Sequence, residues 1–323
     1  HSNFYTCKPI GAIVIMNDKI LLIVNPIAGR GRAAKSVPQI ERDFNRLGIK
    51  YDIVFTIRQW HAAELAEDAA KKGYKAVVVA SGDGTANEVL NGLMLARKKG
   101  NNKTAMGQIP VGTGNDFAYG MGLSDDIDEC ITVIADYTLR KIDVGFIKGG
   151  DYPQGRYFGN GIGIGFDATT GFVASRIRFL SGMLVYFIAA LQTIFIYYNA
   201  PRIRLSYNDK ETIMEALQIS IMNGKRMGGG FHFAPNGSPF DGLLDVCMVR
   251  SMNQFKIFSM IPYFIKGTQG KRKEVLEDRT TKIAVVAEKG NLPVHCDGET
   301  ICYAGKELFI QIYPAVLNFI TKA

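Results

Sequence analysis

The sequence predicts an α/β protein whose first part forms a parallel sheet and whose second part is rich in β-strands. Up to about residue 138, apolar strand-like runs alternate with amphipathic helical segments. Repeated β-α units of this kind produce a parallel sheet covered by helices. From about residue 140, strand-like runs follow one another closely, and the length of 323 residues suits two domains.

The first part contains alternating strands and helices. The strands are expected at 20–24, 52–55, 76–80 and 106–110, and the helices at 33–47, 61–72, 85–97 and 125–136. Gly73 directly follows the second helix and is expected to end it in a left-handed conformation. Ser124 precedes the last helix and is its candidate N-cap.

The second part is predicted to consist mainly of strands. They are expected at 140–147, 156–164, 202–207, 213–222, 244–250, 282–286 and 308–312. The polar segment Tyr207–Thr212 ("YNDKET") predicts a hairpin turn between two of them. The apolar segment Gly182–Tyr198 falls just short of the ~20 residues that span a bilayer, so it predicts a core or interfacial helix.

The balance of charges indicates an anionic partner. Lys and Arg total 38 against 30 Asp and Glu, which gives a net charge of +8. A nucleotide, a phospholipid surface or a nucleic acid would suit this charge, and so would a merely solvated surface. Because no recognition helix and no alternation of aromatic and basic residues is present, we expect no nucleic-acid partner.

Cysteine spacing and the N-terminal residues bear on the cellular compartment. The five cysteines show no Cys-x-x-Cys spacing, which favours free thiols in a reducing compartment. The N-terminal residues have no basic region and no cleavage site of the secretory kind. Because a new strand follows Met16, we expect residues 1–15 to be additions ahead of a native start.

The segment Ala76–Leu93 ("AVVVASGDGTANEVLNGL") is the most informative one in the sequence. Gly82 and Gly84 lack a Cβ atom, so the chain can turn sharply between strand and helix and approach a bulky anion. The free N–H groups at the start of the following helix favour negative charge. Asp83 would repel a phosphate unless a cation or a donor lay between them, which indicates Mg²⁺ or a hydroxyl-bearing ligand. The alternative is an ordinary strand-to-helix turn with Asp83 as its cap.

Two further glycine-rich loops follow predicted strands. One is Ile109–Gly120 ("IPVGTGNDFAYG"), which contains Asp116, and the other is Ile23–Gly31 ("IVNPIAGRG"). The carboxyl ends of parallel strands meet at one rim of the sheet, where ligands bind. The three loops together therefore predict a phosphate site, although none is a Walker A loop because no Gly-Lys-Ser/Thr is present.

These motifs resemble the catalytic domain of the diacylglycerol kinase family, in its soluble bacterial lipid kinase branch. In the first part the resemblance rests on Asn25–Gly29, Thr56 before His61, Ser81–Asn87 and Pro110–Asp116. In the second part, "FGNGIGIGFDA", "NGKRMGGGFHFAPNGSPFDGLLDV" and "HCDGE" stand in the family's order, so the resemblance covers the chain from about Lys19. One departure is Ser81, where many members have glycine; because serine is small, we expect binding to be preserved.

The resemblance implies a fold with two domains and a cleft between them. The first is an α/β ATP-binding domain of the NAD kinase and diacylglycerol kinase type, and the second is a β-sandwich. We expect residues 16–138 and about 314–323 to form the first domain. Residues 139–313 would form the second domain with inserted helices.

The resemblance also implies a set of residues around ATP. These are Asn25, Pro26, Ile27, Ala28, Gly29, Thr56, Ser81, Gly82, Asp83, Gly84, Thr85, Ala86, Asn87, Thr113, Asn115 and Asp116.

The segment "HCDGET" contains the candidate catalytic acids Asp297 and Glu299. Phosphoryl transfer needs positioning, a metal to neutralise the phosphates and a base for the incoming hydroxyl. In an extended segment both side chains would point the same way, whereas a turn at Gly298 would make them diverge. The local pattern favours a plain Asp-Gly turn. The resemblance implies that Glu299 is the proton acceptor, with Asp297 as its rival.

The segment "SPFDGLLD" is a candidate metal site. The resemblance implies a structural Mg²⁺ held by Asp241 and the main-chain oxygens of Ser238 and Leu243. A carboxylate with backbone carbonyls suits a hard cation. The alternative is an Asp-Gly β-turn without metal.

The function implied by the resemblance is transfer of the ATP γ-phosphoryl group to a membrane-lipid hydroxyl, most simply from diacylglycerol to phosphatidic acid. The alternatives are another lipid, a soluble substrate such as NAD or fructose phosphate, and a non-catalytic lipid-binding role. The last alternative is disfavoured because several acids are intact, namely Asp83, Asp116, Asp241, Asp297 and Glu299.

A membrane-borne substrate implies a cytoplasmic protein that docks transiently on an anionic membrane surface. The predicted docking face comprises the apolar helix at 182–198, Arg176, Arg178 and Lys271–Lys273. The sequence leaves open whether the chain forms a homodimer.

Overall fold

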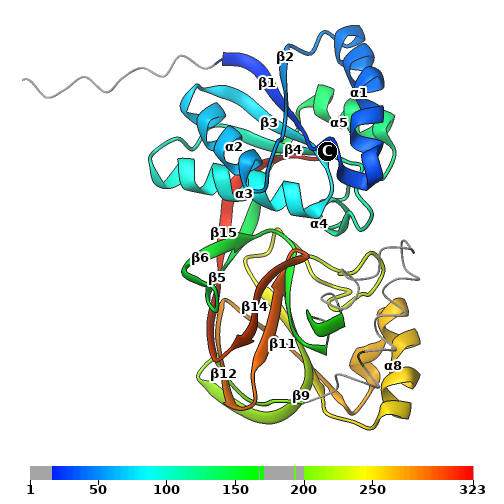
Figure 1. The fold of residues 1–323 in the computed structure, drawn as a ribbon, viewed down its shortest axis with the longest axis vertical. Helices are drawn as coiled ribbons and strands as arrows, with labels where there is room; N and C mark the ends of the chain where they lie inside the picture. The colour runs from blue at the N-terminus through cyan, green and yellow to red at the C-terminus, as the bar shows by residue number, and fades with distance from the viewer. Residues whose placement is uncertain (1–16, 167, 171–192, 194–199, 323) are drawn as a thin grey trace, which may run out of the picture.

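The computed structural model describes residues 17–166, 168–170, 193 and 200–322. Two domains follow one another along the longest axis of the molecule, joined by the long strands β5 (Leu139–Gly149) and β15 (Glu307–Ile320) (Figure 1). The predicted start at Met16 and the predicted docking helix at 182–198, with Arg176 and Arg178, lie outside the described residues except for Thr193. Within the described part of the chain, no helix has the length and apolarity needed to cross a bilayer.

The first domain is built on a parallel sheet, as predicted. Its own strands are β1 (Asn17–Val24), β2 (Tyr51–Phe55), β3 (Tyr74–Ser81) and β4 (Ala105–Pro110). The order across the sheet is β2-β1-β3-β4-β15, and each strand in this series runs parallel to its neighbours. The sheet therefore brings the ends of β1, β3 and β4 to one rim.

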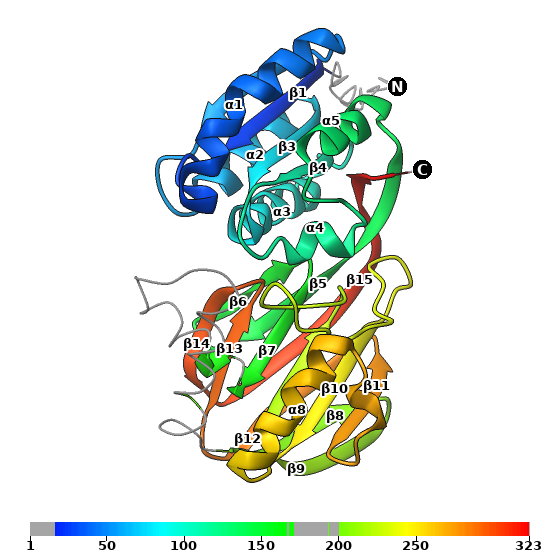
Figure 2. The same cartoon turned by 90° about the vertical axis from the view of Figure 1, so that its right-hand side faces the viewer.

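Helices cover both faces of this sheet. They are α1 (Ala28–Arg46), α2 (His61–Lys71), α3 (Asp83–Lys98), α4 (Asp116–Gly120) and α5 (Ile127–Asp136). α2 packs on α3 over one face, and α1 packs on α5 over the other (Figures 1 and 2). The strands between them must be apolar on both sides, which explains their continuous runs of Val, Ile and Ala.

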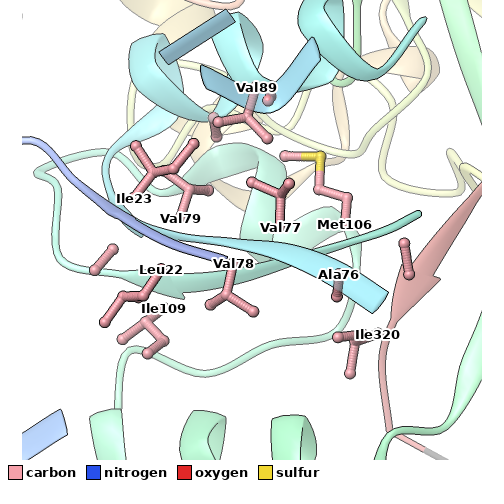
Figure 3. Close-up of a cluster of buried hydrophobic side chains, with 14 of the residues drawn as sticks. Leu22, Ile23, Ala76, Val77, Val78, Val79, Val89, Met106, Ile109 and Ile320 are labelled. Carbon is pink, nitrogen blue, oxygen red and sulfur yellow. The ribbon is translucent and has the colours of Figure 1, made fainter. Parts of the chain in front are cut away.

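The core of the first domain shows this two-sided burial (Figure 3). Leu22 and Val78 lie on one side of the sheet, and Ile23 and Val79 lie on the other. All four side chains are fully buried. This core holds the glycine-rich loops that follow the strands in fixed positions.

The predicted N-cap of α5 is wrong. Asp126, not Ser124, occupies the N-cap position, and its side chain accepts hydrogen bonds from the N–H groups of Asp128 and Glu129. Ser124 lies two residues earlier, where its hydroxyl accepts from Asp126 N over 3.3 Å. Both residue types cap well, and the position of the chain turn decides between them.

The second domain is a β-sandwich, which confirms the predicted fold class. Its further strands are β6 (Tyr152–Phe158), β7 (Gly161–Gly165), β8 (Arg202–Tyr207), β9 (Lys210–Met222), β10 (Leu244–Arg250), β11 (Val275–Thr280), β12 (Lys282–Lys289), β13 (Leu292–Cys296) and β14 (Glu299–Gly305). One layer has the order β6-β5-β15-β12-β8-β9, and the other has the order β14-β13-β7-β9-β10-β11. The long strand β9 belongs to both layers and joins them.

Several details of the second domain differ from the sequence prediction. The single strand expected at 156–164 is two strands, β6 and β7, because the chain turns at Gly159 and Asn160. β11, β13, β14 and the helix α8 (Gln254–Lys266), followed by the short 3₁₀ helix η2 (Gln269–Lys271), were absent from the prediction. The predicted hairpin turn is present, with Asn208 and Asp209 in left-handed conformations.

β5 and β15 form a long antiparallel ribbon between the domains, with a shift in register between Tyr313 and Leu317. Their register runs from the Leu308–Gly149 pair in the sandwich to the Ile320–Leu139 pair in the first domain. β15 then pairs with β4 of the parallel sheet through Phe319. The two domains are thus held by shared strands rather than by a loose linker.

Candidate active site

A cleft of about 540 Å³ opens at the carboxyl ends of β1 and β3, facing the second domain. The predicted site residues that line it are Asn25, Pro26, Ile27, Ala28, Gly29, Thr56, Ser81, Gly82, Asp83, Gly84, Thr85, Thr113 and Glu299. All except Glu299 belong to the first domain. The predicted rim of glycine-rich loops therefore forms one wall of a shared cleft.

The glycine-rich loops contact one another through their backbones. A Cβ atom on Gly112 would lie only 2.4 Å from Gly82 Cα. Gly29 has a φ of +57°, and a Cβ atom there would lie 2.0 Å from the Val111 carbonyl oxygen. Larger residues would push the three loops apart, so glycine is required for the wall to close.

The start of α3 presents an anion site to the cleft. Its N-cap is Gly82, and no described side chain caps the first turn. The N–H groups of this turn remain free to bind an anion, with the helix dipole in the favourable direction. Asn25 Nδ2 donates to Thr85 Oγ1 over 2.9 Å, which ties the first loop to this helix.

The carboxyl groups of Asp83 and Asp116 lie close together at the loop around Gly114. A Cβ atom on Gly114 would lie 3.0 Å from Asp83 Oδ2 and 3.5 Å from Asp116 Oδ2, so glycine lets both approach. The Phe117 N–H donates to Asp83 Oδ1 over 3.0 Å. Burial raises the pKa of Asp83, and the N–H groups of Phe117 and Asp116 oppose this effect.

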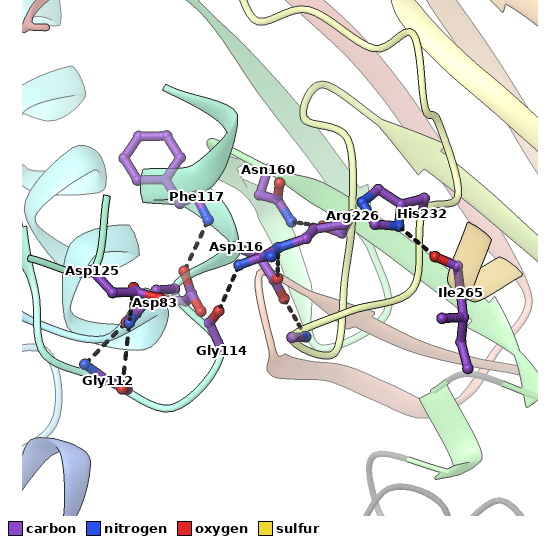
Figure 4. Close-up of polar contacts among 12 residues, drawn as sticks. Asp83, Gly112, Gly114, Asp116, Phe117, Asp125, Asn160, Arg226, His232 and Ile265 are labelled. Carbon is purple, nitrogen blue, oxygen red and sulfur yellow. Dashed lines mark hydrogen bonds and ion pairs between the residues drawn. The ribbon is translucent and has the colours of Figure 1, made fainter. Parts of the chain in front are cut away.

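Asp116 receives its hydrogen-bond partners from the second domain (Figure 4). Arg226 Nε donates to Asp116 Oδ1 over 2.9 Å, and the Gly229 N–H donates to Asp116 Oδ2 over 3.0 Å. Burial first, and repulsion from Asp83 second, raise the pKa of Asp116 to about 7. The Gly229 N–H and the Arg226 guanidinium act in the opposite direction.

Asn115 shapes the second loop. Its φ is +51°, its Oδ1 accepts from the Gly112 N–H over 3.0 Å, and its Nδ2 donates to Asp125 Oδ1 over 2.8 Å. The predicted ATP residues Asn115 and Asp116 are buried and do not line the cleft. Their geometry supports the loop that carries Thr113 rather than direct contact with a ligand.

Ala86 and Asn87 also lie away from the cleft surface. Ala86 is in the core of the first domain. Asn87 connects the two domains, because its Oδ1 accepts from Arg156 Nη2 over 2.6 Å and its Nδ2 donates to Asp297 Oδ2 over 2.8 Å. These two predicted residues therefore position the helix and the neighbouring domain.

Asp297 is a buried anchor. Its carboxylate accepts four hydrogen bonds, from Asn87 Nδ2 and from the backbone N–H groups of Gly159, Asn160 and Gly161. The distances are between 2.7 and 3.0 Å. With both oxygens engaged by donors, the geometry does not support Asp297 as the proton acceptor.

Glu299 projects into the cleft from the second domain and lies beside the first helical turn of α3. A Cβ atom on Gly84 would lie 2.9 Å from Glu299 Oε1, and Gln59 Nε2 donates to Glu299 Oε2 over 3.4 Å. Asp297 (φ +48°) and Gly298 (φ +82°) form the turn between β13 and β14. The turn makes the two acids diverge, one into the protein and one into the cleft.

Comparison with known proteins identifies the family. The model of the diacylglycerol kinase catalytic domain matches residues 19–147. The model of the YegS C-terminal NAD kinase β-sandwich-like domain matches residues 160–321, about half of the chain. This chain belongs to the diacylglycerol kinase and YegS-like family. Membership of this kinase family makes the chain a phosphotransferase.

Relatives of this kinase match it over nearly their full lengths. It is 29% identical to a diacylglycerol kinase of Mycobacterium tuberculosis over 93% of this chain and 94% of that protein. It is 27% identical to a diacylglycerol kinase of Bacillus subtilis over 86% of this chain and 88% of that one. A crystal structure of a Bacillus anthracis diacylglycerol kinase, 23% identical, has the same fold with a TM-score of 0.70 over 94% of this chain and 97% of that one.

The cleft of this kinase includes residues that the sequence analysis missed. They are Ile57, Arg58, Gln59, Glu88 and Gly112. Glu88 follows Thr85 by one helical turn, a spacing that could have placed it on the same face. Burial raises the pKa of Glu88, with N–H groups of Trp60 and Ala62 opposing the rise. The loop after β2 offered a signal as well, because it follows a parallel strand as the other loops do.

The carboxylate of Asp241, one of the predicted metal ligands, has two partners within the protein. Asp241 Oδ2 accepts from the Arg279 guanidinium, and Asp241 Oδ1 accepts from Leu243 N over 3.1 Å. Among the described residues, no three His, Cys, Asp or Glu side chains form a group that could hold a metal ion. In this arrangement Arg279 neutralises Asp241, and the set of Asp241 with the main-chain oxygens of Ser238 and Leu243 stays a prediction.

Proposed function

We propose that this kinase transfers the γ-phosphoryl group of ATP to a hydroxyl of a membrane lipid, with diacylglycerol as the acceptor. One observation carries the proposal: the N–H groups at the start of α3 and the carboxylate of Glu299, which comes from the other domain, lie side by side in one cleft. The first wall suits phosphates, and the second offers a base to a hydroxyl. The names of the relatives from Mycobacterium tuberculosis and Bacillus subtilis support diacylglycerol as the acceptor.

The proposed mechanism assigns a separate task to each wall. The N–H groups around Gly82–Thr85 and the loop that carries Thr113 hold the triphosphate and stabilise charge as it develops on the transferred group. The lipid hydroxyl enters beside Glu299, which takes its proton as oxygen attacks the γ-phosphorus. ADP leaves with the electron pair of the broken P–O bond. A Mg²⁺ ion bound to ATP would neutralise charge on the phosphates, and no residue of this chain is assigned to hold it.

The experiment that tests this proposal is a phosphoryl-transfer assay with ATP labelled at the γ-phosphate. The protein is incubated with mixed vesicles that contain diacylglycerol, and in parallel with a total lipid extract, NAD or fructose phosphate. Labelled phosphatidic acid, identified by its mass, is the expected product. Label on a different lipid, or on NAD, would replace the proposed acceptor, and no transfer to any acceptor would refute the kinase activity.

We further propose that α8 takes part in docking to the anionic membrane that holds this acceptor. Phe255, Pro262 and Lys266 are exposed at positions i, i+7 and i+11, so they share one face of the helix. Phe255 is 84% exposed, and the exposed Lys271 and Lys273 follow the helix. An apolar side chain beside basic ones suits an anionic bilayer surface.

Vesicle sedimentation tests the docking proposal. The protein is expected to sediment with vesicles that contain phosphatidylglycerol and to remain in solution with phosphatidylcholine alone. Phe255→Ser is expected to weaken this binding. Equal binding to both vesicle types would contradict an electrostatic contribution, and unchanged binding of the variant would exclude this face of α8.

A further inference from the structure

Arg226 reaches from the second domain into the second glycine-rich loop of the first domain. It lies in the segment between β9 and β10, and its side chain is 17% exposed. Besides its bond to Asp116, Arg226 Nη2 donates to the Gly114 carbonyl oxygen over 3.2 Å. The guanidinium also lies 3.8 Å from the centre of the Tyr119 ring. One side chain thus contacts a carbonyl, a carboxylate and an aromatic ring of the loop region 114–119. Figure 4 shows the first two of these contacts.

The backbone around Arg226 is held by the same network that positions Glu299. Asn160 Nδ2 donates to the Arg226 carbonyl oxygen over 2.9 Å. The Asn160 N–H in turn donates to Asp297 Oδ1 over 3.0 Å, and Asp297 begins the turn that leads to Glu299. The position of Arg226 is therefore linked to the carboxylate wall of the cleft by a continuous series of hydrogen bonds.

The other side of this network reaches the nucleotide wall. Asp116, the ion-pair partner of Arg226, lies beside Asp83, and Asp83 lines the cleft next to Gly84. Thr113, which also lines the cleft, is adjacent to the Gly114 carbonyl that Arg226 binds. Without a cation at Asp116, the two neighbouring carboxylates would repel each other and displace the loop.

We infer that Arg226 is a positioning residue for the nucleotide: it fixes the loop 113–116 and the Asp83 carboxylate from the opposite domain. The inference rests on the proposed function, since it concerns ATP in the same cleft. Arg226 touches neither the cleft nor the reacting atoms. Its loss is expected to weaken ATP binding while Glu299 and the acceptor side keep their geometry.

The alternative is an ordinary interdomain ion pair that stabilises the fold without affecting the nucleotide. The two roles differ in what they change. If Arg226 positions the loop, its loss changes the affinity for ATP more than the KM for lipid, and the effect depends on Asp116. Lysine at this position restores ATP affinity in part, because it keeps the positive charge but cannot make the contacts to both Asp116 and the Gly114 carbonyl. A merely structural role lowers the melting temperature and changes both substrates alike.

The test uses the full-length protein with Arg226→Ala, Arg226→Lys, Asp116→Asn and the Arg226→Ala/Asp116→Asn double variant. ATP affinity is measured by titration calorimetry, together with the KM for ATP, the KM for diacylglycerol in vesicles, and the melting temperature. Arg226→Ala is expected to weaken ATP binding roughly tenfold, with the lipid KM unchanged within about twofold. Arg226→Lys is expected to lie between Arg226→Ala and the wild type, and the double variant to bind ATP no more weakly than the single variants.

Arg202→Ala is the matched control, because it removes an Arg–Glu pair between β8 and β12 in the sandwich. It is expected to bind ATP like the wild type. Wild-type ATP affinity in Arg226→Ala, or strictly additive losses in the double variant, would overturn the inference. If Arg226→Ala does not fold, Arg226→Lys decides by the same readouts. A wild-type protein that does not bind ATP would refute the proposed function instead.

Discussion

The first-domain wall of the cleft is built on closely packed glycine-rich loops, whereas the second-domain wall contributes one residue of the described lining, Glu299. On the first wall, Gly82 and Gly112 bring two loops so close that a Cβ atom on Gly112 would lie 2.4 Å from the Gly82 Cα atom. On the second wall, Glu299 lies at the end of a turn whose preceding acid, Asp297, accepts four hydrogen bonds inside the protein.

Because of this difference, substitutions in the two walls should change different properties of the protein. The shape of the first-domain wall depends on the close packing of its glycine-rich loops and on the charged side chains that hold the loop 112–116. In the second domain the two acids have different surroundings. Glu299 is available to a substrate in the cleft, whereas both oxygens of Asp297 accept hydrogen bonds within the protein. Substitutions at these two acids should therefore separate turnover from stability, although they lie only two residues apart.

The largest expected effect is that of Glu299→Gln on turnover. Removing the proton acceptor is expected to lower kcat by roughly 10²- to 10⁴-fold. The melting temperature and the affinity for ATP should stay unchanged, because the described contact of this side chain is one long hydrogen bond from Gln59. The measurement pairs the labelled-ATP assay with calorimetry. Near-normal turnover would show that Glu299 is not the base.

Asp297→Ala is expected to affect stability most. The substitution leaves Asn87 and three backbone N–H groups without their shared acceptor. A loss of about 3 kcal/mol in the free energy of unfolding is expected, since each bond to a charged acceptor contributes but the site can relax in part. Urea unfolding measures this loss. Unchanged stability together with lost turnover would instead make Asp297 a catalytic acid.

Asp116→Asn is expected to stabilise the protein in a pH-dependent way. The pKa of Asp116 is raised to about 7 in the folded protein, so the ionised form destabilises the fold. Below the ordinary carboxyl range both states bind the proton and no penalty exists; the penalty grows as pH rises and is complete above about pH 7. The variant should gain about 1–2 kcal/mol over the wild type at pH 8 and lose this advantage towards pH 4.

Melting temperatures of both proteins between pH 4 and pH 8 measure this effect. Gln39→Ala is a suitable control, because Gln39 pairs with the exposed Asp128 and neither residue lines the cleft. An advantage that does not change with pH would contradict the raised pKa. If Asp116→Asn is instead more stable at pH 8 and also binds ATP more weakly, the protein keeps Asp116 for function at a cost in stability.

The smallest expected effect is that of Gln59→Ala. Gln59 comes from the first domain and donates to the carboxylate of Glu299 in the second, so in the proposed mechanism it would orient the base. Because the bond is 3.4 Å long, its loss is expected to lower kcat only about 2- to 5-fold. Steady-state kinetics with diacylglycerol vesicles measure it. A fall as large as that of Glu299→Gln would give Gln59 a direct role in the reaction.

The sequence predicted the first domain well because its signals are local. Alternating apolar runs and amphipathic helices identified each strand and helix of the parallel sheet. A parallel sheet brings the ends of its strands to one rim, so the loops that contain Gly29, Gly82 and Gly112 could be expected to meet. The resemblance to lipid kinases added Glu299, which no local pattern distinguishes from an ordinary turn residue.

The sequence was least informative where contacts between distant segments decide the surroundings of a side chain. Asp297 became an anchor because Gly159–Gly161, well over one hundred residues away, turn their N–H groups towards it. Asp241 has Arg279 as a partner 38 residues later, which no spacing rule indicates. Asn115 and Asp116 share a motif with Thr113, yet their side chains point away from the cleft and support the loop.

The sequence by itself determined the parallel sheet, its glycine-rich loops and the residue types from which a phosphate site can be built, because these depend on periodicity and on the conformational freedom of glycine. Only the tertiary structure decided which acid faces the cleft, which acid is buried, and that a cation from the second domain holds the loop of the first. The physical reason is that the environment of a charged side chain is made by segments that become neighbours only on folding.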